Sequence, residues 1–221
     1  EIQKYMNPLE KINIGVVGVG HLGQYHVKHL SKISGANLIG VFDSDNKRNN
    51  SISKQYNTRI FDNLNSLIQS CDALSIVTPT QCHAEIAEQC IRSNKHVFIE
   101  KPITVSLSEA DNILRLANNS GVIVQVGHIE RLNPALLALD SYTLKPKYIE
   151  VQRLAPYTAR GTEVPVVLDL MIHDIDIVLA LVKSQVDTIH ASGLSIMTDS
   201  VDIANARIQF VDGTIANITS S

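Results

Sequence analysis

The sequence predicts an α/β chain: a doubly wound parallel sheet, followed by an α+β domain with an open, largely antiparallel sheet. Three observations predict it. Short β-branched apolar runs alternate with helical patterns over residues 12–126. A glycine-rich turn separates the first apolar run from the first helical stretch. After residue 134 the pattern changes to one long helix and successive extended runs, so we expect domains at 1–127 and 128–221.

Five strands are expected in the first domain, and each is nearly all apolar, as parallel strands covered on both faces are. They are 12–17, 37–42, 73–77, 96–99 and 122–126. Helical patterns lie between them, including 81–93, with Ala84, Ala87 and Ile91 three and four residues apart, and 106–118, which ends before Gly121.

The second domain begins with a short helix that runs from Asn133-Pro134 to about Tyr142. A strand at 148–154, a loop, and a helix at 166–182 follow. Three extended runs come last, at 188–196, 204–210 and 214–220, and Asp212-Gly213 is a hairpin signal between the last two. The chain stops within the last of these runs, so we expect this domain to be incomplete at its C-terminus.

Composition excludes several classes of protein. The 221 residues are 44% hydrophobic and 19% charged, close to the globular average. The net charge of −3, with scattered Lys and Arg, argues against nucleic-acid and anionic-membrane partners. No apolar run is long enough for a membrane helix, and the first residues are too polar for a signal peptide. Cys71, Cys82 and Cys90 match no zinc or disulfide framework, which indicates free thiols in the cytoplasm.

The glycine-rich turn is Gly18, Gly20 and Gly23, with His21 and Leu22 between the last two. A turn of this kind between strand and helix lets the backbone approach a pyrophosphate at the helix N-terminus. A tight turn without a ligand is the alternative. We expect these five residues to contact a cofactor.

Asp43 lies 20 residues after Gly23, at the end of the second strand. An acidic side chain there hydrogen-bonds a ribose diol and repels a 2′-phosphate. It is also a common turn residue. Together the two signals predict a dinucleotide-binding Rossmann domain with NAD, while Lys47 and Arg48 keep NADP open.

Two further groups follow strands at their carboxyl ends, where ligands of open α/β sheets collect. Thr78, Pro79, Thr80 and His83 are expected to contact the cofactor, and Thr80 is equally a candidate helix N-cap.

Glu100 and Lys101 follow the next strand and precede Pro102. Both are expected near the cofactor, with Lys101 donating to a substrate oxygen or acting as an acid or base. A surface lysine before a turn proline is the alternative.

Asp169, His173 and Asp176 interrupt an apolar helix. At 100° per residue they fall within about 60° of one another, while Asp174 lies off this stripe. Burial of such groups is costly unless they pair or serve a ligand, so the stripe is expected to line a cleft. An internal His–Asp hydrogen bond is the alternative.

No metal site is expected. His173 and its neighbouring carboxylates lack an obvious third ligand. Three histidines on the first helix have a spacing typical of helix packing: His21, His26 and His29.

Two loop residues are expected to meet the substrate. Arg131 lies in a polar stretch after the fifth strand, and it could instead pair with Glu130 or Asp140. Tyr157 lies in a loop that could also be plain surface.

These motifs, in this order and on these elements, resemble the Gfo/Idh/MocA family (glucose-fructose oxidoreductase/inositol dehydrogenase), over nearly the whole chain. The resemblance implies a Rossmann domain for NAD or NADP and an α+β domain that supplies the substrate cleft. That second domain usually also supplies the oligomer interface, so the full-length form is expected to be a homo-oligomer. Family members are typically longer than this chain.

The resemblance also implies catalytic roles for Lys101, Asp169 and His173, acting on a sugar or nucleotide sugar. Four segments are similar to bacterial members that oxidise the 3-hydroxyl of a UDP-N-acetylhexosamine: GHIERLNPA, RLAPYTARGT, EVPVVLDLMIHDID and DSVDIANARIQF. A dehydrogenase of a free sugar or inositol, a non-catalytic NAD(P)-binding sensor and an assembly partner are the alternatives.

Overall fold

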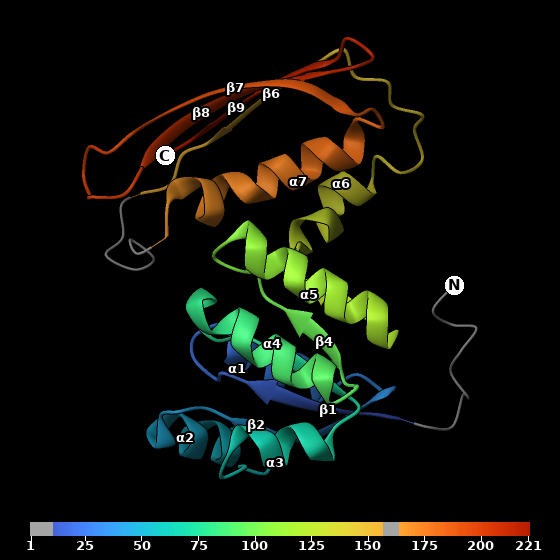
Figure 1. Ribbon diagram of the computed structural model, residues 1–221, viewed down its shortest axis with the longest axis vertical. Coiled ribbons are helices and arrows are strands. Elements are labelled where there is room, and N and C mark those ends of the chain that lie inside the picture. The colour runs from blue at the N-terminus through green and yellow to red at the C-terminus, as the bar shows by residue number, and fades with distance from the viewer. Residues whose placement is uncertain (1–10, 157–163) are drawn as a thin grey trace. The chain divides into compact units, whose positions relative to one another are not determined.

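The computed structural model describes residues 11–156 and 164–221 (Figure 1). Contacts divide the chain into two compact units, Glu1–Gly127 and His128–Ser221. Each unit has its own sheet, and apolar clusters form on each sheet.

The first unit is built on a parallel five-stranded sheet in the order β2-β1-β3-β4-β5. Its strands are β1 (Ile12–Val17), β2 (Ala36–Phe42), β3 (Ala73–Ile76), β4 (His96–Ile99) and β5 (Val124–Val126). The sequence pattern predicted all five, with ends that differ by two residues at most.

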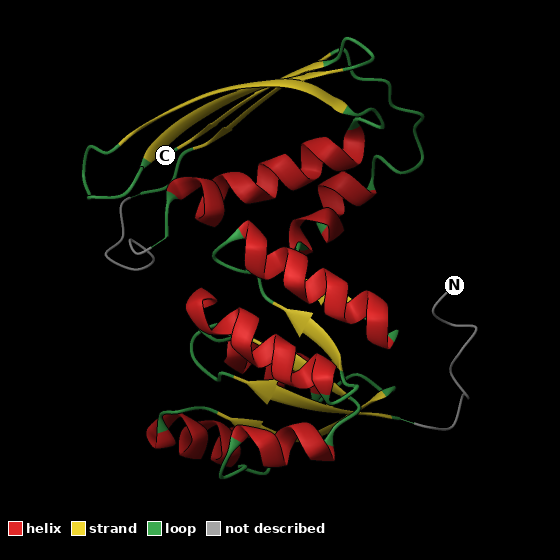
Figure 2. Ribbon diagram, in the orientation of Figure 1, coloured by secondary structure: helices red, strands yellow, loops and turns green. Residues whose placement is uncertain are grey.

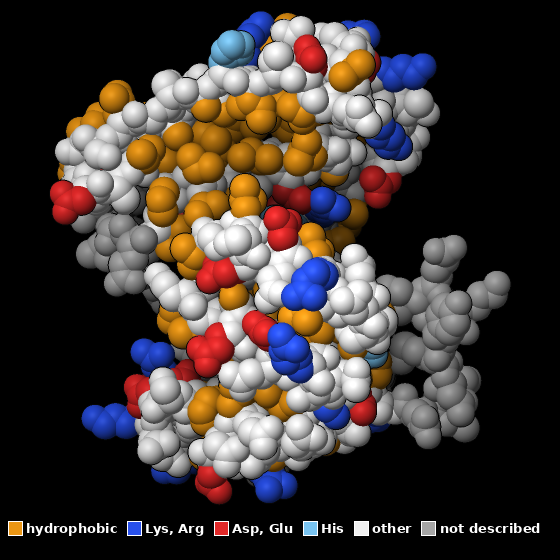
Figure 3. All heavy atoms as spheres, in the orientation of Figure 1, with side chains coloured by type: hydrophobic (Ala, Val, Ile, Leu, Met, Phe, Trp, Pro, Cys, Tyr) orange, Lys and Arg blue, Asp and Glu red, His pale blue; other side chains and the backbone are white. Residues whose placement is uncertain are grey.

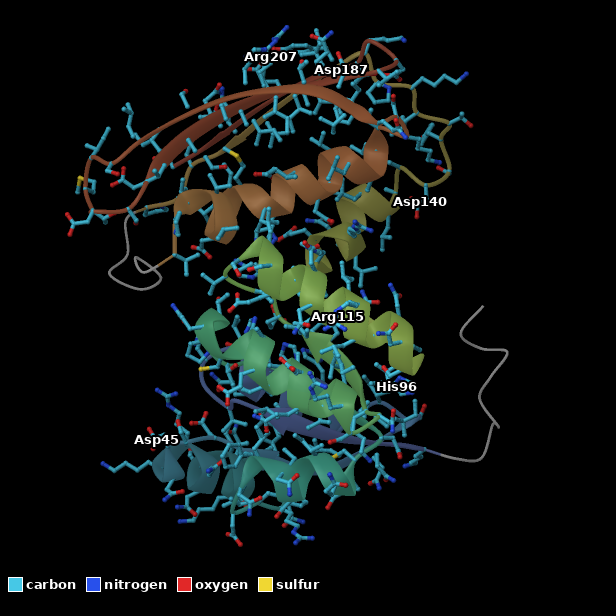
Figure 4. All side chains as sticks on the ribbon, viewed as in Figure 1. Asp45, His96, Arg115, Asp140, Asp187 and Arg207 are labelled. Carbon is cyan, nitrogen blue, oxygen red and sulfur yellow. The ribbon has the colours of Figure 1, made fainter. Side chains whose placement is uncertain are left out.

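Helices cover both faces of this sheet (Figures 1 and 2). They are α1 (Gly23–Leu30), α2 (Asn46–Tyr56), α3 (Leu64–Ser70), a 3-10 turn η2 (Thr80–Cys82), α4 (His83–Arg92) and α5 (Leu107–Ser120). Local signals set their ends: Asp45, labelled in Figure 4, caps α2 by accepting the N–H of Lys47 at 2.8 Å. Ser106 and Glu109 form a capping box at the start of α5, and Gly121 ends that helix with φ +70°.

Two apolar clusters stabilise the first unit, one on each face of its sheet. Val16 belongs to the cluster under α1 and α2, and Val17 to the cluster under α3, α4 and α5, because successive strand residues point to opposite faces. Cys71 and Cys90 lie in the second cluster as free thiols. Burial raises the pKa of the Cys71 thiol to about 11 and that of Cys90 to about 12.

The second unit holds a four-stranded sheet in the order β6-β9-β8-β7. Its elements are η3 (Ile129–Leu132), α6 (Pro134–Leu137), β6 (Tyr148–Arg153), a π-helical turn η4 (Val167–Met171), α7 (Ile172–Leu181), β7 (Val186–Leu194), β8 (Ile203–Phe210) and β9 (Ile215–Ser220). The expected antiparallel meander is present, whereas β6 pairs with β9 in parallel. The helix expected to reach about Tyr142 ends at Leu137.

The sheet of the second unit covers its core with one face. Alternate β8 residues, from Ala204 to Phe210, are buried with Met171 and Val178 in one cluster, while Arg207 lies on the side away from α7 (Figure 4). Every residue of the edge strand β7 is exposed. Hydrophobic side chains gather between β7 and α7 (Figure 3). Within 11–156 and 164–221, no helix is long and apolar enough to cross a membrane.

Candidate cofactor and substrate site

Two glycines of the first turn are required by the chain itself. Gly18 has φ +85°, and a Cβ there would lie 2.7 Å from the carbonyl oxygen of Val77. A Cβ at Gly23 would overlap the carbonyl oxygen of Gly18. Any side chain at either position would therefore displace the turn that joins β1 to α1.

Gly20 differs, because the protein around it leaves room. A Cβ there would make only an ordinary contact, 3.6 Å from Nη1 of Arg48. His21 and Leu22 follow on the exposed surface and lead into the N-terminus of α1. The backbone at Gly20 is thus open to a ligand at a helix N-terminus, as a bound pyrophosphate requires.

Asp43 holds this turn in place at the end of β2. Its Oδ2 accepts the N–H of Val19 and its Oδ1 that of Asp45, both at 2.8 Å, and the residue is 8% exposed. Each carboxylate oxygen can accept two hydrogen bonds and here accepts one from a backbone N–H, so each can still accept one from a ribose diol. Arg48 Nη1 lies 4.0 Å from Oδ2.

His83 has two hydrogen-bond partners within the protein. Its Nδ1 lies 2.9 Å from the carbonyl oxygen of Pro102 and its Nε2 2.9 Å from that of Thr78, with 1% of the residue exposed. The ring therefore braces the loops after β3 and β4 against each other.

The N-cap expected at Thr80 is absent, because the η2 turn begins at Thr80 and places Pro79 in the N-cap position without a side-chain hydrogen bond. Thr78 offers a different group. Its Oγ1 is buried and has no hydrogen-bond partner among the described residues, and its methyl group would lie 2.9 Å from a Cβ on Gly18. A buried hydroxyl without a partner next to the glycine turn fits a bound cofactor.

Glu100 and Lys101 stand at the carboxyl end of β4, and the peptide between Lys101 and Pro102 is cis. Glu100 is 8% exposed, and its Oε1 lies 3.0 Å from Nε2 of His26 on α1. The spacing of His26 on the first helix is typical of helix packing, and the structure adds Glu100 as a specific partner of its ring. Gly23, one turn before His26, and the adjacent Val27 are both buried, so this side of α1 faces the sheet.

In the second unit, two ion pairs hold α7. Arg131 binds Asp176 through Nε at 2.6 Å and Nη2 at 2.5 Å, so it pairs with neither Glu130 nor Asp140. Arg153 on β6 binds Asp174 in the same manner, at 2.8 and 2.7 Å.

The two carboxylates of these pairs are buried, while Arg131 remains more than half exposed. Hydrogen bonds from each guanidinium to its carboxylate raise the pKa of Arg131 and of Arg153. Sequence reasoning missed Arg153 because its partner Asp174 lay outside the expected polar stripe.

Asp169 and His173 are partly buried, on η4 and α7 respectively. The expected stripe assumed a regular α-helix from 166 to 182. The π-helical turn at Val167–Met171 winds more residues into one turn, so Asp169 is rotated from the position that the α-helical spacing gave it. Asp176, the third member of the stripe, is bound to Arg131. Tyr157 lies outside the described residues.

The expected cofactor residues of the first unit share one edge of its sheet. Gly18 follows β1, Asp43 follows β2, Thr78 follows β3 and Lys101 follows β4, all at carboxyl ends of parallel strands. Among the residues described, no group of three or more His, Cys, Asp or Glu side chains is placed to hold a metal ion.

Comparison with known proteins extends these observations. Residues 12–128 match the Gfo/Idh/MocA family, described as an oxidoreductase family with an NAD-binding Rossmann fold. The UDP-N-acetylglucosamine 3-dehydrogenase of Acidithiobacillus ferrooxidans is 38% identical over 208 residues, which cover 94% of this chain and 66% of the relative. The chain thus spans just under two thirds of the length of that relative.

The solved structure of the Acidithiobacillus enzyme superposes with a TM-score of 0.91 at 36% identity, and covers 96% of this chain and 70% of that one. The scyllo-inositol 2-dehydrogenase (NAD(+)) of Bacillus subtilis is 27% identical over 230 residues, 96% of this chain and 67% of the relative.

Proposed function

Because the chain belongs to the Gfo/Idh/MocA family of oxidoreductases, we propose that it oxidises a sugar hydroxyl, specifically the 3-hydroxyl of a UDP-N-acetylhexosamine. The observation that carries the substrate class is the 38% identity, over 94% of the chain, to an enzyme named for UDP-N-acetylglucosamine. The open backbone at Gly20, the Thr78 hydroxyl and Asp43 support NAD as the cofactor.

NAD supplies the hydride acceptor when bound. His173 takes the proton from the reacting hydroxyl, and Asp169 orients the ring or a substrate hydroxyl. Lys101 donates to the substrate oxygen and stabilises the developing alkoxide charge. Arg131 keeps an exposed guanidinium edge while Asp176 holds the other, which suits an anionic group of a nucleotide sugar. Tyr157 is proposed to contact the substrate as well.

The first experiment mixes the purified chain with NAD and UDP-N-acetylglucosamine and follows the absorbance of reduced nicotinamide. We expect reduced cofactor to accumulate with this substrate and not with scyllo-inositol. Reduction with scyllo-inositol alone would overturn the substrate class. Binding of NAD without reduction of NAD by either compound would favour a sensor over an enzyme.

Variants test the assigned roles. His173→Ala and Lys101→Met should each lower kcat by about 10²- to 10⁴-fold, because each removes a proton acceptor or donor at the reacting oxygen. The affinity for NAD, measured by calorimetry, should stay within about twofold of the unaltered chain. His29→Ala, at an exposed position in the last turn of α1, is the matched control. Equal loss of NAD binding in the His173 variant would contradict its role as a base.

We also propose that the full-length form of the protein is a homo-oligomer. The exposed edge strand β7 and the apolar side chains between β7 and α7 support it, because contiguous exposed apolar surface is typical of interfaces. Analytical ultracentrifugation of the full-length form should detect a dimer or a larger assembly, and a monomer at all concentrations would contradict the proposal.

A further inference from the structure

A line of polar side chains runs through the first unit, from β3 through α1 to the end of β4. Ser75 Oγ lies 2.9 Å from His26 Nδ1, and His26 Nε2 lies 3.0 Å from Glu100 Oε1. Ser75 is 4% and Glu100 8% exposed. The proposed chemistry uses neither Ser75 nor His26.

The chemistry of these groups defines the direction of the hydrogen bonds. A carboxylate only accepts, so His26 Nε2 carries the hydrogen that Glu100 receives. In the neutral ring Nδ1 then accepts, and the Ser75 hydroxyl donates to it. Both nitrogens of the His26 ring have hydrogen-bond partners, and the centroid of the Phe98 ring lies 5.6 Å from that of the imidazole. These three contacts determine the orientation of the imidazole.

Glu100 in turn contacts the backbone around it. Its Oε2 accepts the N–H of Lys101 at 3.3 Å. Its Oε1 packs against the backbone at Gly127, where a Cβ would come within 3.1 Å. The carboxylate therefore lies between the start of the Lys101 peptide and Gly127, which follows β5, and His26 stabilises it there, because a buried carboxylate without a partner is costly.

We propose that His26 is a positioning residue for Lys101. Anchored on Ser75, it holds the Glu100 carboxylate and so determines where the backbone that carries Lys101 leaves β4. The importance of this position for turnover rests on the proposed function of Lys101, whereas the anchoring itself does not.

Two substitutions of His26 separate its two hydrogen bonds. His26→Asn places an amide near the position of Nδ1, so it keeps the contact with Ser75 and loses that with Glu100. His26→Gln places an amide near Nε2 and keeps the contact with Glu100. His29→Asn, at an exposed position of the same helix, controls for the helix propensity of asparagine.

The first readout is hydrogen exchange at the amide of Lys101, which needs no turnover. Exchange should accelerate about tenfold in His26→Asn, because the Glu100 carboxylate that accepts this N–H is released. His26→Gln should restore most of the protection. Unchanged exchange in His26→Asn would overturn the proposal, as would equal acceleration in both variants.

The second readout is steady-state kinetics. His26→Asn should lower kcat by about 10- to 100-fold, as misplacement of a reacting group does, with KM for NAD within about twofold. If His26 had a merely structural role, kcat would fall equally in both variants and in proportion to the loss of thermal stability. That result would contradict the proposal. If the unaltered chain reduces no NAD, the proposed function fails while hydrogen exchange still tests the anchoring.

If His26→Asn does not fold, Ser75→Ala gives a second test. It removes only the far anchor of the ring, and exchange at Lys101 should then rise to a smaller extent. Exchange that stays at the level of the unaltered chain would overturn the anchoring role of Ser75.

Discussion

The ion pair between Arg153 and Asp174 predicts an asymmetric cost of substitution. The guanidinium side chain is 32% exposed and the carboxylate side chain 3%. Removal of one partner of a buried pair costs about 3–5 kcal/mol, because the other charge is left uncompensated. Arg153→Met leaves the buried carboxylate alone and should cost about 3 kcal/mol. Asp174→Leu leaves a guanidinium that still reaches water, so about 2 kcal/mol is expected.

The double variant Arg153→Met/Asp174→Leu leaves no buried charge. It should cost about 1 kcal/mol or less, since apolar replacement of a whole buried pair is often neutral. Hydrogen exchange of β8 and β9 amides measures the free energy of opening of the second unit. Arg207→Met is the matched control, because this arginine lies on the outer face of the same sheet and should cost below about 0.5 kcal/mol.

The reasoning would be refuted if Arg153→Met cost no more than Arg207→Met. It would also be refuted if Asp174→Leu were the more destabilising single variant, because burial of the remaining charge would then not set the cost.

Further outcomes are expected from groups elsewhere in the chain. Alkylation at neutral pH should modify the exposed Cys82 and spare Cys71 and Cys90, as peptide mass spectrometry can show. Burial raises the pKa of the Cys71 thiol to about 11. The stabilising contribution of the neutral thiol is therefore present below the ordinary thiol pKa and is lost as the pH rises toward 11. Cys71→Ala should reduce this fall of the unfolding free energy with pH, as measured by urea titrations. Gly23→Ala should weaken NAD binding at least about tenfold by calorimetry, because the turn must shift. Burial alone would raise the pKa of Asp202, but hydrogen bonds from backbone N–H groups outweigh this effect and lower the pKa. The carboxylate therefore stabilises the fold above the ordinary carboxyl pKa, and this stabilisation is lost as the pH falls through the lowered pKa. Asp202→Asn should abolish this pH-dependent loss.

The strands of the first unit and the ends of α5 were predictable because their signals are local. Apolar runs of β-branched residues marked the strands of the first unit, and the capping box at Ser106 with Gly121 marked both ends of α5. The glycine turn was equally predictable. Close contacts within one strand–turn–helix segment, and with the strand beside it, require glycine at positions 18 and 23.

Partners of polar side chains were not predictable from this pattern. His26 and Glu100 are 74 residues apart, and Arg131 and Asp176 are 45 apart. Periodicity indicates which face of an element is apolar, but not which distant element packs against that face. The two backbone carbonyl groups that His83 contacts, those of Thr78 and Pro102, were likewise not predictable.

By itself, the sequence determined the order of the elements, the dinucleotide turn and the residue types at the carboxyl ends of the strands, because neighbouring residues carry this information. Only the tertiary structure decided which carboxylates are held by cations, where the π-helical turn rotates Asp169, and that His26 holds Glu100. Those features depend on the packing of segments far apart in the chain, where burial makes an unpartnered charge costly and so selects one arrangement of partners.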